Sequence, residues 1–105
     1  MNPGTDLRSP MDDLDLARRL ERLRRTVLML QTELRRMHVD EPLLAEIELQ
    51  MERGIATEPR CVGLRAPVDM LRENLLGPRP ELFSDGIRGC EQLKDAIEGV
   101  VSGLA

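Results

Sequence analysis

The residues of this chain that could carry out catalysis are few and scattered. His38 is the single histidine, and it stands in the segment "HVDE" close to Asp40 and Glu41, a grouping that could transfer protons. That segment is a short link between two predicted helices, and it contains neither a nucleophile nor a glycine-rich loop that could hold a phosphate. A helix C-terminus stabilises a histidine cation. The pattern therefore favours a capping role for His38, and we predict no catalytic residue.

The two cysteines, Cys61 and Cys90, are the other candidates for reactive groups. Arg60 could lower the pKa of the neighbouring Cys61 thiol and make it reactive, whereas the alternative is a small, part-buried and reduced thiol. Two cysteines and one histidine are too few for a closed zinc site. We expect no metal and no cofactor, and the chemistry-bearing residues do not favour an enzyme.

Composition narrows the classes of partner. Phe83 is the one aromatic residue, so recognition by stacking aromatic rings on bases or sugars is nearly excluded. The net charge of -4 argues against general nucleic-acid binding. An arginine-rich first helix leaves a DNA-contacting regulator as an alternative, although its arginines fall on outer positions and fit a solvated face; they are Arg18, Arg19, Arg22, Arg24, Arg25, Arg35 and Arg36.

The sequence also predicts where the protein resides. Its first residues, "MNPGTDLRSPMDD", lack the cationic and apolar pattern of a secretory signal. No apolar run approaches the roughly 20 residues that a membrane span needs. We therefore expect a cytoplasmic protein. The excess of arginine over lysine is typical of a GC-rich genome, which favours a bacterial origin.

Periodicity and helix-breaking residues predict an all-α fold in one small domain, residues 11–105, after a disordered N-terminal arm at residues 1–10. The expected helices span about 11–38, 42–53, 67–76 and 85–104, in a long–short–short–long order. Pro42 and Pro67 are placed at helix starts, and Gly54 and Gly77 at helix ends. Residues 54–66 are expected to form an ordered connector with an extended piece at Arg60–Leu64.

The first predicted helix carries a regular apolar seam. Its residues recur at alternating intervals of four and three, a heptad pattern typical of a coiled coil; they are Leu16, Leu20, Leu23, Val27, Leu30, Leu34 and Met37. Residues 16–38 hold seven Arg against two Glu, a net charge of +5, and residues 40–53 hold five acids against one Arg, or -4. The short link and the opposite charges predict that the first two helices form an antiparallel hairpin.

The second predicted helix is too short to cover this seam. It can reach roughly the part from Val27 to Met37, so Leu16, Leu20 and Leu23 need another apolar cover. Either the last helix or a second chain could supply it. If two copies pair through the seam, antiparallel pairing is favoured, because parallel pairing brings like charges together at the flanking positions.

The last predicted helix carries a stripe of small residues beside its apolar face. The stripe is Gln92, Ala96, Gly99 and Gly103, at intervals of four, three and four. Small residues allow another helix to approach closely, which suggests a docking groove. The alternative is a frayed C-terminus, because each interior glycine costs a helix about 1 kcal/mol relative to alanine.

Together these features favour a non-catalytic protein–protein interaction module, such as an adaptor, an assembly factor or a chaperone-type subunit, that binds another protein or a second copy through apolar helix faces. The basic–acidic hairpin is loosely similar in architecture to small helical co-chaperones of bacterial secretion systems. A small helical enzyme with a site between helices is the alternative. The residues predicted to bind the partner are Leu16, Leu20, Leu23, Val27, Leu30, Ala96, Gly99, Val100 and Gly103.

Overall fold

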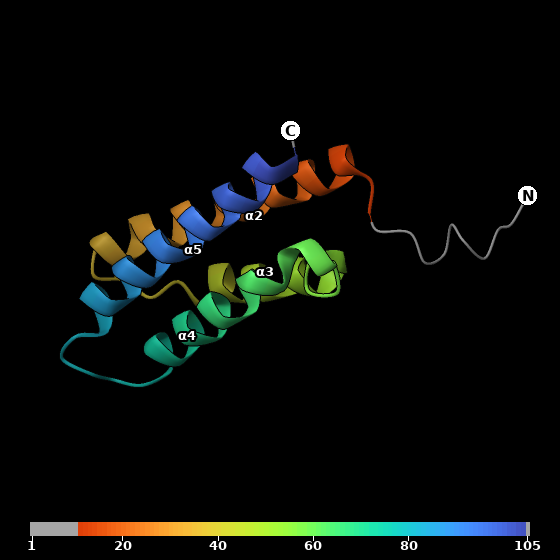
Figure 1. The fold of residues 1–105 in the computed structure, drawn as a ribbon. Helices are drawn as coiled ribbons and strands as arrows, with labels where there is room; N and C mark the ends of the chain where they lie inside the picture. The colour runs from red at the N-terminus through yellow and green to blue at the C-terminus, as the bar shows by residue number, and fades with distance from the viewer. Residues whose placement is uncertain (1–10, 105) are drawn as a thin grey trace, which may run out of the picture.

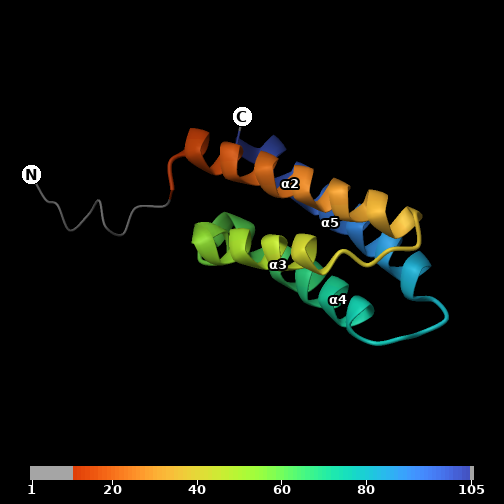
Figure 2. The same ribbon diagram turned by 180° about the vertical axis from the view of Figure 1, so that it is seen from behind.

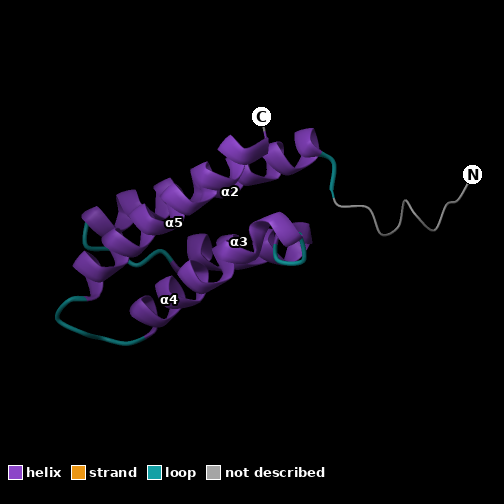
Figure 3. Ribbon diagram, in the orientation of Figure 1, coloured by secondary structure: helices purple, strands orange, loops and turns teal. Residues whose placement is uncertain are grey.

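The computed structural model describes residues 11–104, so the predicted arm at residues 1–10 lies outside the described part of the chain. The described residues form four α-helices, one π-helical turn and one 3-10 helix. Figure 3 shows helices and loops and no strand within this range. The all-α prediction is therefore confirmed. No helix between residues 11 and 104 combines the length and the apolar character needed to cross a membrane.

The first helix, α2, spans Asp13–Arg35, two residues shorter at its start than predicted. Asp12 caps it, because its carboxylate accepts a hydrogen bond from the backbone N–H of Leu14 at 3.0 Å. Asp13 and Asp15 lie in the first turn, where their charge complements the helix dipole. The acidic cluster therefore determines where α2 begins.

A residue in the left-handed region, Met37, ends α2. Its φ is 62°, and the backbone N–H groups of Met37 and His38 donate to the carbonyls of Leu34 and Glu33 at 3.0 and 2.9 Å. This is the Schellman arrangement, in which glycine usually occupies the left-handed position. The side chain of Met37 is 70% exposed. The prediction that Met37 continues the apolar seam is therefore wrong.

The second predicted helix is divided into two parts. The first part, α3, spans Glu41–Gln50 and is capped by Asp40, which accepts a hydrogen bond from the N–H of Leu43 at 3.1 Å. The second part, η1, is the π-helical turn Met51–Ile55, and Gly54 breaks it with a φ of 110°. The chain of α2 and α3 reverses direction at the short link, which confirms the antiparallel hairpin (Figure 2).

The connector that follows is helical where we predicted an extended piece. Residues Pro59–Leu64 form the 3-10 helix η2. The carboxylate of Glu58 accepts a hydrogen bond from the backbone N–H of Arg60 at 3.2 Å, in the manner of a helix cap. Proline suits the first turn of a helix. The cap and Pro59 together explain why the chain turns here.

The last two helices lie close to their predicted positions. Helix α4 spans Arg65–Leu76 and begins two residues before Pro67, which is tolerated because N–H groups in a first turn need no partner within the helix. Helix α5 spans Leu82–Leu104, three residues longer at its start than predicted. The four α-helices are 23, 10, 12 and 23 residues long, which confirms the long–short–short–long order.

The helices form two layers. Helices α2 and α5 lie side by side and antiparallel in one layer, and α3 and α4 form the other (Figure 1). The closest packing joins α2 to α5, α4 to α5 and α2 to α3. One core runs between the layers and contains the leucines of α2 together with apolar residues from every other element.

The seam of α2 is enclosed by the chain itself. Leu16, Leu20 and Leu23 have no exposed surface, and neither do Val27 and Leu30. Helix α5 runs along the length of α2, while α3 and η1 cover its other side. The sequence left two alternatives for covering the first part of the seam, the last helix or a second chain. In the structure the last helix covers it.

Close helix packing depends on a glycine outside the predicted small-residue stripe. A Cβ atom at Gly86 would lie 2.9 Å from Cδ2 of Leu75 and 3.0 Å from Cδ1 of Leu34. Nothing lies within 4 Å of the corresponding positions at Gly99 and Gly103. The close approach to α5 is therefore made near its N-terminus.

This difference between glycines predicts opposite effects of the same substitution. We expect Gly86→Ala to destabilise the protein by about 1 kcal/mol, because overpacking costs about 1–3 kcal/mol and exceeds the gain in helix propensity. We expect Gly99→Ala to stabilise it by up to about 1 kcal/mol. Urea denaturation followed by circular dichroism measures both, and equal stabilisation by the two variants would contradict the packing at Gly86.

The left-handed residue at the end of α2 predicts a second pair of opposite effects. We expect Met37→Gly to raise the free energy of unfolding by up to about 1 kcal/mol, because glycine adopts this conformation without the Cβ clash. Met29 is also exposed but lies inside α2, so Met29→Gly should lower stability by about 1 kcal/mol. Thermal unfolding of both variants checks the contrast, and a loss of stability at position 37 would count against the strain.

Candidate functional site

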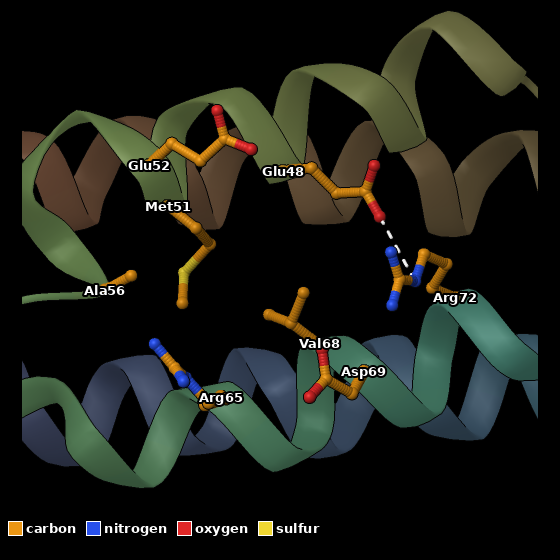
Figure 4. Close-up of a pocket in the computed structure, with 8 residues that line it drawn as sticks. All are labelled: Glu48, Met51, Glu52, Ala56, Arg65, Val68, Asp69 and Arg72. Carbon is orange, nitrogen blue, oxygen red and sulfur yellow. Dashed lines mark ion pairs between the residues drawn. The ribbon is translucent and has the colours of Figure 1, made fainter.

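An open groove separates α3 from α4, and we call it the α3–α4 groove. Each of these helices packs closely on a long helix, α3 on α2 and α4 on α5, and they approach each other less closely than those pairs do. Two adjoining cavities lie along the space between them. Figure 4 shows one of the cavities, with side chains from both helices at its edges. The groove is therefore a side of the bundle that α3 and α4 leave open.

The floor of the groove is apolar. It is formed by Leu44 and Met51 on one side and by Val68 and Leu75 on the other. The two residues of each pair are seven positions apart, or two helical turns, so they project from one face. Figure 4 shows Met51 and Val68 pointing toward each other across the space. These four side chains keep 6–8% of their surface exposed, so the core reaches solvent along this line.

The walls of the groove are charged. The wall that α3 forms together with η1, called the α3 wall, is acidic, and the α4 wall alternates in sign. The groove therefore has four acids against two arginines; the residues are Glu41, Glu48 and Glu52 on the first wall and Arg65, Asp69 and Arg72 on the second. One ion pair crosses the groove, between Oε2 of Glu48 and Nε of Arg72 at 3.4 Å (Figure 4). The remaining charges face solvent and are available to a partner.

The ion pair divides the groove into two cavities. The cavity at the Met51 end measures about 250 Å³, and the cavity at the Leu44 end measures about 320 Å³. Sites for small molecules are usually about 300–1,000 Å³ and enclose most of the ligand. Two small cavities in a line, open along one side, fit a row of side chains better than a compact ligand.

Five of the predicted partner-binding residues belong to the core instead. Leu16, Leu20, Leu23, Val27 and Leu30 have no exposed surface. A partner could contact them only if the bundle opened, so their assignment to a binding surface is wrong for this fold. The same enclosure leaves no exposed seam on α2 for the alternative in which two copies pair through it.

The other four predicted residues lie on α5 and do not form a hollow. Ala96 and Val100 are partly buried and pack against the core, whereas Gly99 and Gly103 are exposed. Helix α5 continues to Leu104, beyond the stripe. The structure therefore does not gather the nine predicted residues into one surface.

Sequence reasoning missed the groove although part of its signal was present. Glu41, Glu48 and Glu52 follow at intervals of seven and four residues, and Arg65 and Arg72 are seven apart. These intervals place each set along one face of a helix. The missing information was which helix lies opposite, because that depends on the packing of all four.

The two cysteines are buried thiols, which contradicts the reactive alternative for Cys61. Burial raises the pKa of the Cys90 thiol to about 12. Burial also raises the pKa of the Cys61 thiol, the charge of Glu58 adds to this effect, and the opposing influence of Arg60 is the smallest of the three. Neither thiol has the lowered pKa that a nucleophile needs.

His38 lies in a cluster that could hold a metal ion by geometry. Ligand atoms of Glu33, His38 and Asp40 all lie within 4.8 Å of one another, and Nδ1 of His38 is 3.0 Å from Oε1 of Glu33. Helix ends account for the same arrangement, since Asp40 caps α3 and His38 closes the C-terminus of α2. The cluster is therefore explained without a ligand.

A buried carboxylate, Glu58, ties the start of α2 to η2. Its Oε1 accepts a hydrogen bond from the N–H of Met11 at 3.1 Å, and its Oε2 accepts one from Nε of Arg60 at 2.9 Å. Arg60 also contacts Asp13 in the first turn of α2. The hydrogen bond from Arg60 holds the pKa of Glu58 below its ordinary value, although burial opposes this. We call these contacts of Glu58 and Arg60 with Met11 and Asp13 the Glu58 clasp. It lies at the end of the bundle where α2 begins, opposite the link between α2 and α3 (Figure 2).

Comparison of the chain with protein-family models, with curated proteins and with solved structures finds no match. A function must therefore be argued from the surface of the bundle. The α3–α4 groove is the place where an apolar core, two cavities and opposed charged walls come together.

The Glu58 clasp predicts a pH-dependent stability. The pKa of the Glu58 carboxyl group is lower in the folded protein than in the unfolded chain. Its contribution to folding stability is therefore complete above the unfolded pKa of about 4.3 and is lost as the pH falls through the lower pKa of the folded state. We expect Glu58→Gln to lower the melting temperature at pH 7 and to make it less dependent on pH below about 4.3. Glu73→Gln, at an exposed site on α4, is the control, and identical acid profiles for Glu58→Gln and the wild type would exclude the clasp as a source of acid sensitivity.

Proposed function

We propose that this protein is a non-catalytic protein–protein interaction module that binds a helix of a partner protein in the α3–α4 groove. The observation that carries the proposal is the apolar floor, made of four core side chains that keep 6–8% of their surface exposed between two charged helical walls. Apolar grooves with polar rims are typical of protein-binding surfaces. An adaptor, assembly-factor or chaperone-type role agrees with such a surface.

The shape of the groove favours a helical occupant. Its α3 wall extends over the twelve residues from Glu41 to Glu52, a rise of about 16 Å or three helical turns. Helices bind in grooves by inserting side chains at intervals of three, four and seven residues. A peptide that binds by strand addition instead needs a sheet edge with free backbone groups, and α3 and α4 satisfy their backbone groups internally. A fifth helix would also continue the layered packing of the bundle.

The lining of the groove supports binding rather than catalysis. Its polar residues are glutamates, an aspartate and arginines, and no histidine, cysteine or hydroxyl residue lines either described cavity. An acid–base or nucleophilic site usually combines such groups with a positioned base. Charged rims instead provide orientation and specificity to a docked partner.

The proposal predicts that cross-linking depends on position around α3 and α4. Ala45 is exposed and lines the groove, whereas Ala66 is exposed on α4 and does not line either described cavity. We expect a photo-cross-linking residue at position 45, in cells of the native host, to attach to one defined segment with apolar residues at helical spacing. Mass spectrometry identifies the segment.

Position 66 is the matched control, because a cross-linking residue there measures the cross-linking that any exposed position outside the groove gives. Equal products from positions 45 and 66 would contradict the groove as the docking site. An attached segment without helical periodicity would contradict the helical occupant. In a second experiment the cross-linking residue is placed at another position of the groove and Ala45→Trp is added. We expect this substitution to suppress cross-linking, because the larger side chain fills the cavity while remaining outside the core.

A further inference from the structure

Most of the charged side chains that line the groove have no ion-pair partner among the described residues. Among the described residues, Glu48 and Arg72 form the single ion pair of the groove. Glu41, Glu52 and Asp69 make no ion pair within the same range, and Arg65 is the one arginine of the walls left without an acidic partner. The open charge is therefore negative, with three acids against one base. A helix that carries cations along its edges complements this pattern, whereas an acidic helix is repelled.

The positions of the acids indicate where those cations lie. Glu41 and Glu52 stand at the two ends of the α3 wall, and Asp69 stands on the α4 wall between the two arginines. Cations are therefore required on both edges of the occupant. The edge that lies along α3 needs cations near its two ends, opposite Glu41 and Glu52. The edge that lies along α4 needs a cation opposite Asp69.

The ion pair across the groove determines where large apolar side chains can enter. It separates the two cavities, whose floors are centred on residues seven positions apart, Leu44 and Met51 on one wall and Val68 and Leu75 on the other. Seven residues correspond to two turns, or about 10 Å. An occupant helix thus needs two large apolar side chains seven residues apart, with small residues between them where it passes over Glu48 and Arg72.

A second copy of the chain does not offer such a helix among residues 11–104. The basic helix is α2, but its apolar seam is buried in its own core. Its exposed side carries Arg18, Arg22 and Arg25 between Leu14 and Met29, which provides cations, but these two large apolar residues are fifteen positions apart rather than seven. The seam of α5 is likewise buried, through Leu93 and Ile97. Because neither long helix of the described residues fits, we take the occupant to be a different polypeptide.

We propose that the partner segment is a cationic amphipathic helix of about three turns, with two large apolar anchors seven residues apart, small residues between them, and Lys or Arg on both flanks. This inference rests on the helix-docking function proposed above and specifies the chemistry of the occupant. The anchors fill the two cavities, and the cations contact Glu41, Glu52 and Asp69. The pair between Glu48 and Arg72 stays closed beneath the small residues.

Synthetic helical peptides test this inference with purified full-length protein. The reference peptide has leucines at i and i+7, alanines between them and lysines on both flanks. One comparison peptide replaces the lysines with glutamates, and another moves the second leucine to i+5. Isothermal titration calorimetry measures the affinities, and chemical-shift changes locate the site. We expect the reference peptide to bind in the groove and each comparison peptide to bind at least about tenfold more weakly.

A charge reversal in the protein provides the matched test. We expect the double variant Glu41→Lys and Glu52→Lys to bind the glutamate peptide more tightly than the lysine peptide, while Glu73→Lys, outside the described cavities, keeps the wild-type preference. Both substituted sites are exposed, and circular dichroism verifies the fold.

Three outcomes would overturn the inference: equal binding of both charge types, equal binding of both leucine spacings, or no binding of any peptide. None of these contradicts the docking function itself, which the cross-linking contrast between positions 45 and 66 judges separately. A dimeric solution mass of the free protein at assay concentration, reduced to that of a monomer by the double variant Glu41→Lys and Glu52→Lys, would indicate a second copy in the groove and would also overturn the inference.

Discussion

The fold depends on the pairing of two helices of equal length. Helices α2 and α5 are both 23 residues long, and α5 helps to bury the α2 seam along its whole length. Each fully buried leucine contributes about 1.5–3 kcal/mol, so this contact dominates the apolar stabilisation. The short helices α3 and α4 must then pack on the remaining side, each against a different long helix. The unequal lengths and separate attachments leave the space between α3 and α4 open, so the groove follows from the construction of the bundle.

Buried polar contacts determine the register of that packing. Nε2 of Gln50 on α3 donates to Oγ1 of Thr26 on α2 at 2.9 Å. Nε2 of Gln31 on α2 donates to the carbonyl of Ile87 on α5 at 3.1 Å. An apolar seam with a heptad repeat can shift by whole repeats at modest cost, and a buried polar pair opposes such shifts. These contacts link the second half of α2 to α3 and to α5. By fixing α3 against α2, they also determine the positions of Leu44 and Met51 along the groove.

Local features of the chain could be predicted to within a few residues, because they depend on nearby groups. Pro42, Gly54 and the spacing of the seam indicated where helices begin, end and bury a face. The extended prediction for Arg60–Leu64 failed because the cap by Glu58 belongs to a network with Met11 and Asp13, far away in sequence. The cover of the seam stayed open for the same reason. Periodicity shows that a face is buried, but the element that covers it depends on how all the helices are arranged.

The small exposure of the groove floor has consequences for the kind of binding it supports. The four floor residues expose only 6–8% of their surface, so the free bundle loses little hydrophobic stabilisation and does not need a partner to fold. An exposed α2 seam would have implied the opposite, an obligate assembly whose subunits are unstable apart. In the groove, affinity must come from anchor side chains that the partner brings, while solvent-exposed wall charges contribute a few tenths of a kcal/mol each and mainly guide and orient the encounter. The proposed interface is expected to weaken as salt screens the charges of the walls. The proposed docking function therefore combines a core that the chain itself encloses with a groove whose walls are charged.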